Sequence, residues 1–114
     1  MQILQVQIND KSIASEIMMG NTFYKRLAGL MNRSEMRKEQ GLLLFPCRQV
    51  HTFGMCFPID AVFLSKDNEI VYIEREMQKN RIGTYIKDAF SVLELCSGVT
   101  KENGLSVGDR LKFV

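Results

Sequence analysis

The chain has 114 residues, of which 46% are hydrophobic and 25% charged, and its formal net charge is +2. This length and balance predict one globular domain over residues 1–114, and no apolar run is long enough to cross a bilayer. The mild positive charge argues against a dedicated nucleic-acid binder.

The N-terminus and the cysteines bear on where the protein works. Residues 1–8 lack the basic start and the continuous apolar stretch of a secretory signal peptide. Cys47, Cys56 and Cys96 are odd in number and show no C-x-x-C spacing. We therefore expect thiols without disulfides and a cytoplasmic protein.

The chain opens with two short segments that read as strands. Residues 2–8 alternate polar and apolar side chains, which is the period of a half-buried strand. A turn cluster follows at Asn9-Asp10-Lys11, and residues 13–19 form a second apolar segment. Together they predict a leading β-hairpin over residues 1–19.

One helix is predicted next. Asn21 or Thr22 can cap it by accepting a hydrogen bond from an unpaired backbone N–H. The apolar residues then fall on one helical face, at Phe23, Leu27, Leu30 and Met31. We predict a helix over residues 22–33, followed by a short helical turn within residues 34–40.

The rest of the chain carries short apolar runs between turn residues. These runs predict strands at 42–45, 50–55, 59–64, 70–74, 90–96 and 110–114. Residues 78–88 show no period, and a short helical turn is expected at 100–103, with Gly104 after it. Many short strands with one helix indicate a mainly-β domain, a barrel or a sandwich.

Several motifs also occur in a recognisable order. Arg26-Leu27-Ala28-Gly29-Leu30-Met31-Asn32-Arg33 is followed by Gly41–Phe45, by His51–Met55 with Pro58-Ile59-Asp60, and by Val92-Leu93-Glu94, Gly98 and Gly108-Asp109. Over residues 20–114 this order resembles the DUF192 family, also called UPF0127. The resemblance implies a compact β-barrel or jelly-roll-like domain with a helix after the second strand. It implies no established activity, although it marks Met55 as a family position.

The stretch around the single histidine is the first candidate site. His51 could act as a base, ligate a metal ion or donate a hydrogen bond. Strand alternation would place His51, Phe53 and Met55 on one face and Thr52 on the other. A histidine at the edge of the core, with its ring nitrogen satisfied, fits the same pattern.

Two carboxylates interrupt apolar strands and must be paired or hydrogen-bonded there. Asp60 could cap backbone N–H groups freed by a bulge near Pro58. Glu94 could pair with Arg26, Arg33 or His51 and tie the helix to the sheet. If the carboxylates converge, they could instead perform acid–base chemistry, or bind a metal ion with His51.

Two further groups of residues have a structural and a functional interpretation. Cys47 and His51 could serve zinc or nucleophilic chemistry, but their spacing straddles a non-helical segment, so buried cysteine is favoured. The basic residues of the predicted helix and the following loop could hold a phosphate or a nucleic-acid backbone. A face exposed to solvent is the favoured interpretation. These residues are Arg26, Arg33, Arg37, Lys38 and Arg48.

We therefore predict a small non-catalytic module, without metal or cofactor, that binds a small molecule or a protein partner in an apolar cleft. The candidate contact residues are Arg26, His51, Phe53, Met55, Asp60 and Glu94. One alternative is a hydrolase or metal-dependent enzyme that uses His51 with Asp60 or Glu94. The other is a nucleic-acid accessory protein.

Overall fold

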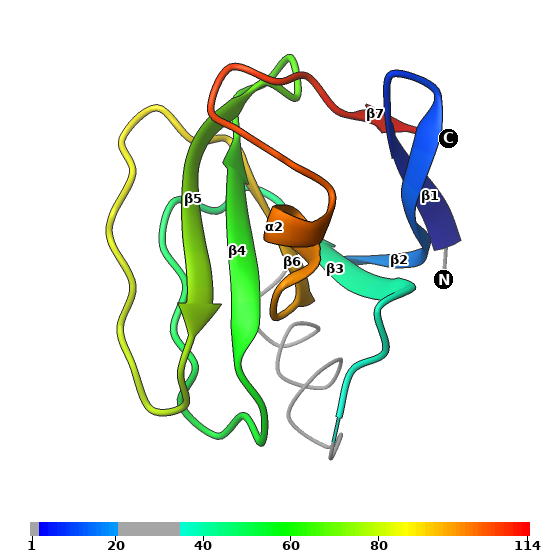
Figure 1. Cartoon of the computed structure of the whole chain (residues 1–114). Helices are drawn as coiled ribbons and strands as arrows, with labels where there is room; N and C mark the ends of the chain where they lie inside the picture. The colour runs from blue at the N-terminus through cyan, green and yellow to red at the C-terminus, as the bar shows by residue number, and fades with distance from the viewer. Residues whose placement is uncertain (1–2, 21–34) are drawn as a thin grey trace.

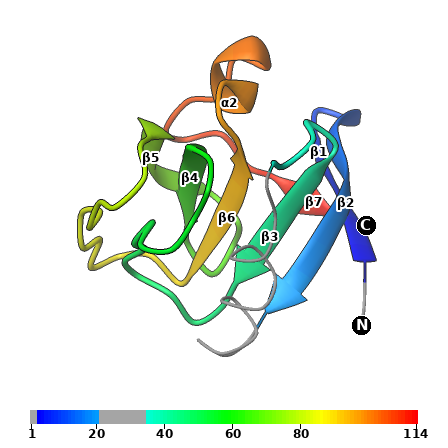
Figure 2. The same ribbon diagram turned by 90° about the horizontal axis from the view of Figure 1, so that it is seen from below.

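The computed structural model describes residues 3–20 and 35–114, and these residues build one curled, seven-stranded sheet (Figure 1). The strand order is β5-β4-β6-β3-β2-β1-β7, and the sheet curls into a half-barrel (Figure 2). The elements are β1 (Ile3–Ile8), β2 (Lys11–Gly20), β3 (Gln40–Leu44), β4 (Ile59–Leu64), β5 (Ile70–Met77), β6 (Ser91–Cys96), α2 (Val99–Glu102) and β7 (Lys112–Phe113). The predicted mainly-β class is confirmed, whereas the helix expected over residues 22–33 lies outside the described residues.

The leading hairpin is confirmed, and its turn has a local cause. Asn9 and Asp10 join β1 to β2 with positive φ angles of 50° and 63°. Asparagine and aspartate tolerate this left-handed conformation better than other side-chain-bearing residues, and a two-residue turn of this hand matches the twist of the strands. The turn cluster seen in the sequence therefore sets the register of the hairpin.

The pairing of β2 with β3 is the one parallel pairing among the named strands. Parallel neighbours need a crossover connection, and residues 21–39 provide its length. The backbone N–H groups of Ser15 and Glu16 both donate to the carbonyl oxygen of Glu39. Residues 35–39 form no helix, contrary to the expected helical turn, because this bonding draws Glu39 alongside β2. No helix within the described ranges is long and apolar enough to cross a membrane.

The sheet is buried on both of its faces, which explains the continuous apolar runs of its central strands. All six residues of β4 are buried. One face, here called the α2 face, packs Val62, Leu64, Leu93 and Leu95 against Val99 and Leu105. The opposite face, here called the loop face, packs Leu42, Ala61, Phe63 and Val92 against Val50, Met55, Phe57 and Ala89.

Gly41 opens the Gly41–Phe45 motif because the strands meet tightly at that position. A Cβ atom there would lie 2.8 Å from the Ile17 Cδ1 atom and 2.9 Å from the backbone oxygen of Glu94. Real Cβ atoms are not found so close to backbone atoms, so a side chain would push β3 away from β6. The glycine thus keeps Leu42 and Glu94 in register on the loop face.

Candidate functional site

Two segments distant in sequence lie side by side and form a ribbon, here called the loop ribbon, from residues 48–53 and 79–87. Backbone hydrogen bonds join them, from Thr52 N to Arg81 O at 2.9 Å and from Gly83 N to Val50 O at 2.8 Å. His51 and Ile82 form an antiparallel bridge between these bonds. Residues 78–88 are otherwise irregular, as predicted, yet this pairing fixes their backbone.

The strand predicted over residues 50–55 is wrong, because only His51 in that stretch makes a β-bridge. The N–H of Met55 donates to the carbonyl oxygen of Thr52 at 3.2 Å, which closes a turn. Gly54 occupies that turn with φ 80°, a conformation that favours glycine. Because the chain reverses there, Met55 leaves the line of His51 and Phe53 and packs into the loop face.

Thr52 is the residue that holds the loop ribbon together, and it was not among the candidate residues. Its hydroxyl donates to the carbonyl oxygen of Gln78 and accepts the N–H of Arg81 at 2.9 Å. Its side chain is 0% exposed. Alternation assigned it to the face opposite His51, but the sequence carries no sign of its partners, which lie far along the chain.

Thr52→Val tests this anchoring role. The substitution keeps the shape of the side chain but leaves the carbonyl oxygen of Gln78 and the N–H of Arg81, both in part-buried hydrogen bonds, without their partner. We expect a loss of about 1–3 kcal/mol in the free energy of unfolding. Hydrogen exchange should accelerate at Arg81 and Gly83, and a variant whose exchange rates and stability match the wild type would contradict the role. Thr84→Val, at an exposed position of the same segment, is the matched control.

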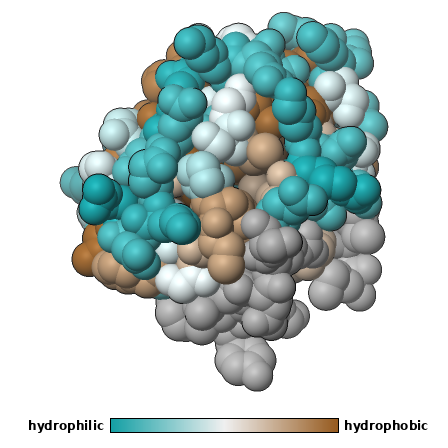
Figure 3. Space-filling model, turned by 60° about the horizontal axis from the view of Figure 1, so that its bottom comes forward, coloured by the Kyte–Doolittle hydropathy of each residue, from teal (hydrophilic) through white to brown (hydrophobic). Residues whose placement is uncertain are grey.

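A cluster of apolar and aromatic side chains reaches solvent on the outer side of the loop ribbon. The rings of His51 and Phe53 have centroids 5.5 Å apart and are tilted by 33°. Phe53 is 46% exposed, and Ile82, across the bridge from His51, is 67% exposed. Phe53, His51 and Ile82 are here called the ribbon patch. Figure 3 shows hydrophobic atoms reaching the surface among hydrophilic ones on one face of the molecule.

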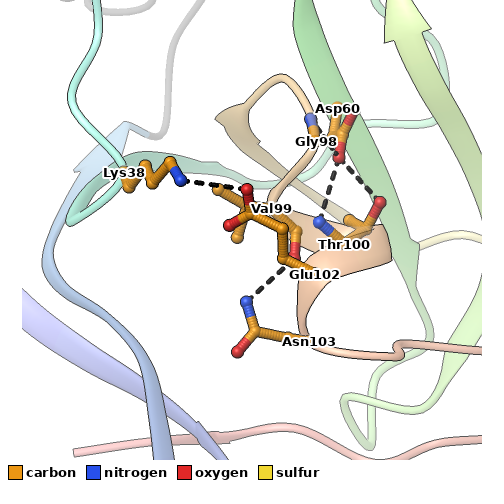
Figure 4. A network of polar contacts seen from close by, with 7 residues as sticks. All are labelled: Lys38, Asp60, Gly98, Val99, Thr100, Glu102 and Asn103. Atoms are coloured by element: carbon orange, nitrogen blue, oxygen red, sulfur yellow. Dashed lines mark hydrogen bonds and ion pairs between the residues drawn. The ribbon is translucent and has the colours of Figure 1, made fainter.

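Asp60 is a cap inside the fold (Figure 4). A bulge in β5 sets Arg75 and Glu76 opposite Asp60, and the N–H of Glu76 donates to its Oδ1 atom at 2.8 Å. The Oδ2 atom accepts Gly98 N at 3.1 Å, Thr100 N at 3.0 Å and Thr100 Oγ1 at 2.7 Å.

Asp60 therefore accepts hydrogen bonds from backbone N–H groups, as the capping interpretation of the sequence expects. Gly98, the N-cap of α2, has no side chain to bond the first N–H groups of that helix, so Asp60 does this from β4. Asp60 is 0% exposed, and four donors of the chain surround its carboxylate.

Glu94 lies on the other face of the sheet from Asp60. Leu93 and Leu95, its neighbours in β6, pack on the α2 face, so Glu94 points to the loop face. Asp60 points to the α2 face, because it accepts the N–H of Thr100 in α2. The cross-strand neighbours of Glu94 are Leu42 and Ala61, both on the loop face, and its side chain is 0% exposed. The structure therefore does not bring the two carboxylates together.

The cysteines carry no sign of nucleophilic chemistry. Among the described residues, which include all three cysteines, no disulfide is formed. The thiol of Cys47 donates to the carbonyl oxygen of Gln49 at 3.2 Å. Burial, and to a smaller extent the charge of Asp60, raises the pKa of Cys96, so its thiol stays protonated near neutral pH.

Two further expectations from the sequence concern the arginines of the predicted helix and a metal site. Arg26, a candidate contact, and Arg33 lie outside the described residues. Within residues 3–20 and 35–114, no three side chains of His, Cys, Asp or Glu group closely enough to hold a metal ion.

Comparison with solved structures identifies two proteins of the same fold. A protein of unknown function from Novosphingobium aromaticivorans superposes with a TM-score of 0.77 at 19% identity, covering 96% of this chain and 83% of that one. A Sinorhizobium meliloti protein, described as a "putative transcription regulator", superposes with a TM-score of 0.80 at 22% identity, covering 96% and 91%. At these identities the likeness concerns the fold alone.

Comparison with sequences gives a family but no characterised relative. No curated protein matches the chain. Residues 4–113 match DUF192, a family described as "Uncharacterized ACR", and this span includes every motif from Arg26 to Asp109. The protein therefore belongs to the DUF192 family.

Proposed function

We propose that this protein is a small non-catalytic binding module whose contact surface is the ribbon patch of Phe53, His51 and Ile82. The observation that carries the proposal is the exposure of Phe53, 46%, on a segment whose backbone is held by Thr52 and Arg81. Exposed apolar groups on a rigid loop are typical of binding sites, because no ordering cost opposes the contact.

The proposal moves the binding surface away from the expected cleft. Met55 is 8% exposed and packs in the core of the loop face, so it is not part of the exposed surface. Ile82 takes its place at the surface, because the bridge sets it opposite His51. The sequence did not identify Ile82 as a contact residue, because residues 78–88 show neither a helical nor a strand period.

The two carboxylates favour binding over catalysis. An acid or base must reach the substrate to transfer a proton. Asp60 and Glu94 are each 0% exposed, and they lie on opposite faces of the sheet. A hydrolase that relies on both of them, or on His51 with Asp60, is therefore less well supported than a binding module.

The anionic dye anilinonaphthalene sulfonate tests the proposed surface directly, because its fluorescence rises when it binds apolar groups. We expect the folded protein to enhance the dye fluorescence. The double variant Phe53→Ser with Ile82→Ser should lose most of this enhancement while keeping its thermal unfolding midpoint. Both side chains are substantially exposed, so their loss removes little core packing.

Val107→Ser is the matched control, since Val107 is 64% exposed but lies in the loop before β7, away from the ribbon patch. It should bind the dye as the wild type does. Equal loss of fluorescence in the control and the double variant would contradict a specific surface. No enhancement by the wild-type protein would contradict the proposal altogether.

A further inference from the structure

We propose that the loop ribbon binds single-stranded nucleic acid, with bases stacked on Phe53 and Tyr85 and with phosphates held by the basic side chains around them. This inference rests on the proposed binding surface and names its partner. It follows from how charge and exposed rings are placed on two segments that the fold brings together.

The charge of the two segments is one-sided. Residues 46–58 and 77–87 carry four basic side chains, at Arg48, Lys79, Arg81 and Lys87, and no Asp or Glu. One carboxylate from β5 reaches these segments, because Glu74 Oε1 accepts the N–H of Thr84 at 3.2 Å. The whole chain has 15 Lys and Arg against 13 Asp and Glu, so the remainder of the chain is net negative. Although the total charge is mild, these two segments carry an excess of basic over acidic side chains, which complements the charge of a phosphate backbone.

These charges are also available, unlike those of Arg37 and Lys38 in the basic cluster expected from the sequence. Arg37 pairs with Glu16 at 3.0 Å, and Lys38 pairs with Glu102 at 2.9 Å. Between described residues, no ion pair involves Arg48 or the three basic residues of 77–87. All four are exposed. The nearest acidic residues in sequence, Glu76 and Asp88, flank the ends of the segment.

Exposed rings belong to the same two segments as these charges. Phe53 is 46% exposed and Tyr85 is 58% exposed, and Ile82, in the same segment as Tyr85, is 67% exposed. Stacking on aromatic side chains binds bases of any sequence, and a positive groove follows the backbone of the strand. The Nε of Arg48 donates to the carbonyl oxygen of Ala89 at 3.1 Å, which holds its guanidinium in place.

Single strands fit this surface better than a duplex does. Rings stack on bases only where the base faces are open, and a duplex buries those faces. A site that bound a duplex through its phosphates alone would not require exposed rings at Phe53 and Tyr85. The combination therefore points to an unpaired strand.

Fluorescence anisotropy with the full chain tests the inference. The probes are fluorescein-labelled oligomers of deoxythymidine and of uridine, about 12 nucleotides long, and a mixed-sequence duplex of the same length. Binding is followed from about 25 to about 200 mM sodium chloride. We expect both single strands to bind more tightly than the duplex, and the affinity to fall as salt rises.

Two variants separate stacking from charge. Phe53→Ala should weaken binding by about tenfold with an unchanged salt slope, because it removes stacking alone. Lys79→Ala with Arg81→Ala should lower the slope of log affinity against log salt by about 1.4, since each phosphate contact contributes about 0.7. The control, Lys11→Ala with Lys112→Ala, removes two exposed lysines of the hairpin and β7 and should leave the slope unchanged.

The outcomes separate this inference from the proposed function. Dye bound at the ribbon patch without any oligomer binding at low salt would overturn the nucleic-acid inference and leave a protein partner for the same surface. Failure of both probes would overturn both. Equal slope changes in the control and the ribbon variant, or no effect of Phe53→Ala, would also overturn the inference.

Discussion

Replacing Asp60 with asparagine is expected to lower the free energy of unfolding by about 3–5 kcal/mol. The carboxylate accepts four hydrogen bonds, one at Oδ1 and three at Oδ2, and the side chain is 0% exposed. An asparagine amide would turn an N–H group toward other N–H groups, whichever way it is oriented. The buried donors of Glu76, Gly98 and Thr100 cannot all be satisfied after that change.

The effect should be spread over two elements of the fold. Asp60 closes the bulge of β5 through Glu76 and caps α2 through Gly98 and Thr100. Thr100→Val removes only the 2.7 Å bond from the hydroxyl, so we expect a smaller loss of about 1–2 kcal/mol. The ratio of the two losses separates the whole cap from one of its bonds.

Urea unfolding at neutral pH measures both variants, with Asp67→Asn as the control. Asp67 is exposed in the turn between β4 and β5, and its substitution should change stability by less than about 0.5 kcal/mol. If Asp60→Asn unfolds at the same urea concentration as Asp67→Asn, the capping role is wrong.

Replacing Glu94 with alanine is the second large change, with an expected loss of about 3 kcal/mol or more. The side chain is 0% exposed on the loop face, between Leu42 and Ala61. Truncation to alanine leaves a cavity beside a residue that is already small. It also removes a buried polar group from its partner.

Glu94→Gln separates the charge from the packing, because glutamine fills nearly the same volume. A loss for glutamine close to that for alanine indicates that the charge matters most, whereas a much smaller loss indicates packing. Glu39→Ala, at an exposed position before β3, is the control. A midpoint of thermal unfolding unchanged by Glu94→Ala would show that the side chain is not buried as described.

Much of the fold could be read from local patterns. Asn9 and Asp10 between an alternating segment and an apolar one identified the leading hairpin, and the polar break after Leu64 identified the hairpin of β4 and β5. These features depend on neighbours in sequence, since turn conformation and side-chain alternation are local properties. The continuous apolar runs likewise pointed to strands covered on both faces.

The candidate site was only partly readable in this way. Alternation correctly paired His51 with Phe53, whose rings are neighbours. It misplaced Met55, because the turn at Gly54 reverses the chain one step earlier. A single glycine with positive φ decides whether a methionine faces a ligand or the core.

The tertiary structure decided the rest, because the bonds that matter join residues far apart in the chain. Alternation shows that Asp60 and Glu94 each interrupt an apolar strand, but only the pairing of β4 with β6 sets them on opposite faces. Only the pairing of residues 48–53 with residues 79–87 sets Ile82 opposite His51. Local pattern determined a mainly-β protein, and the order of its motifs indicated the DUF192 family. The long-range hydrogen bonds determined which of its polar residues support the fold.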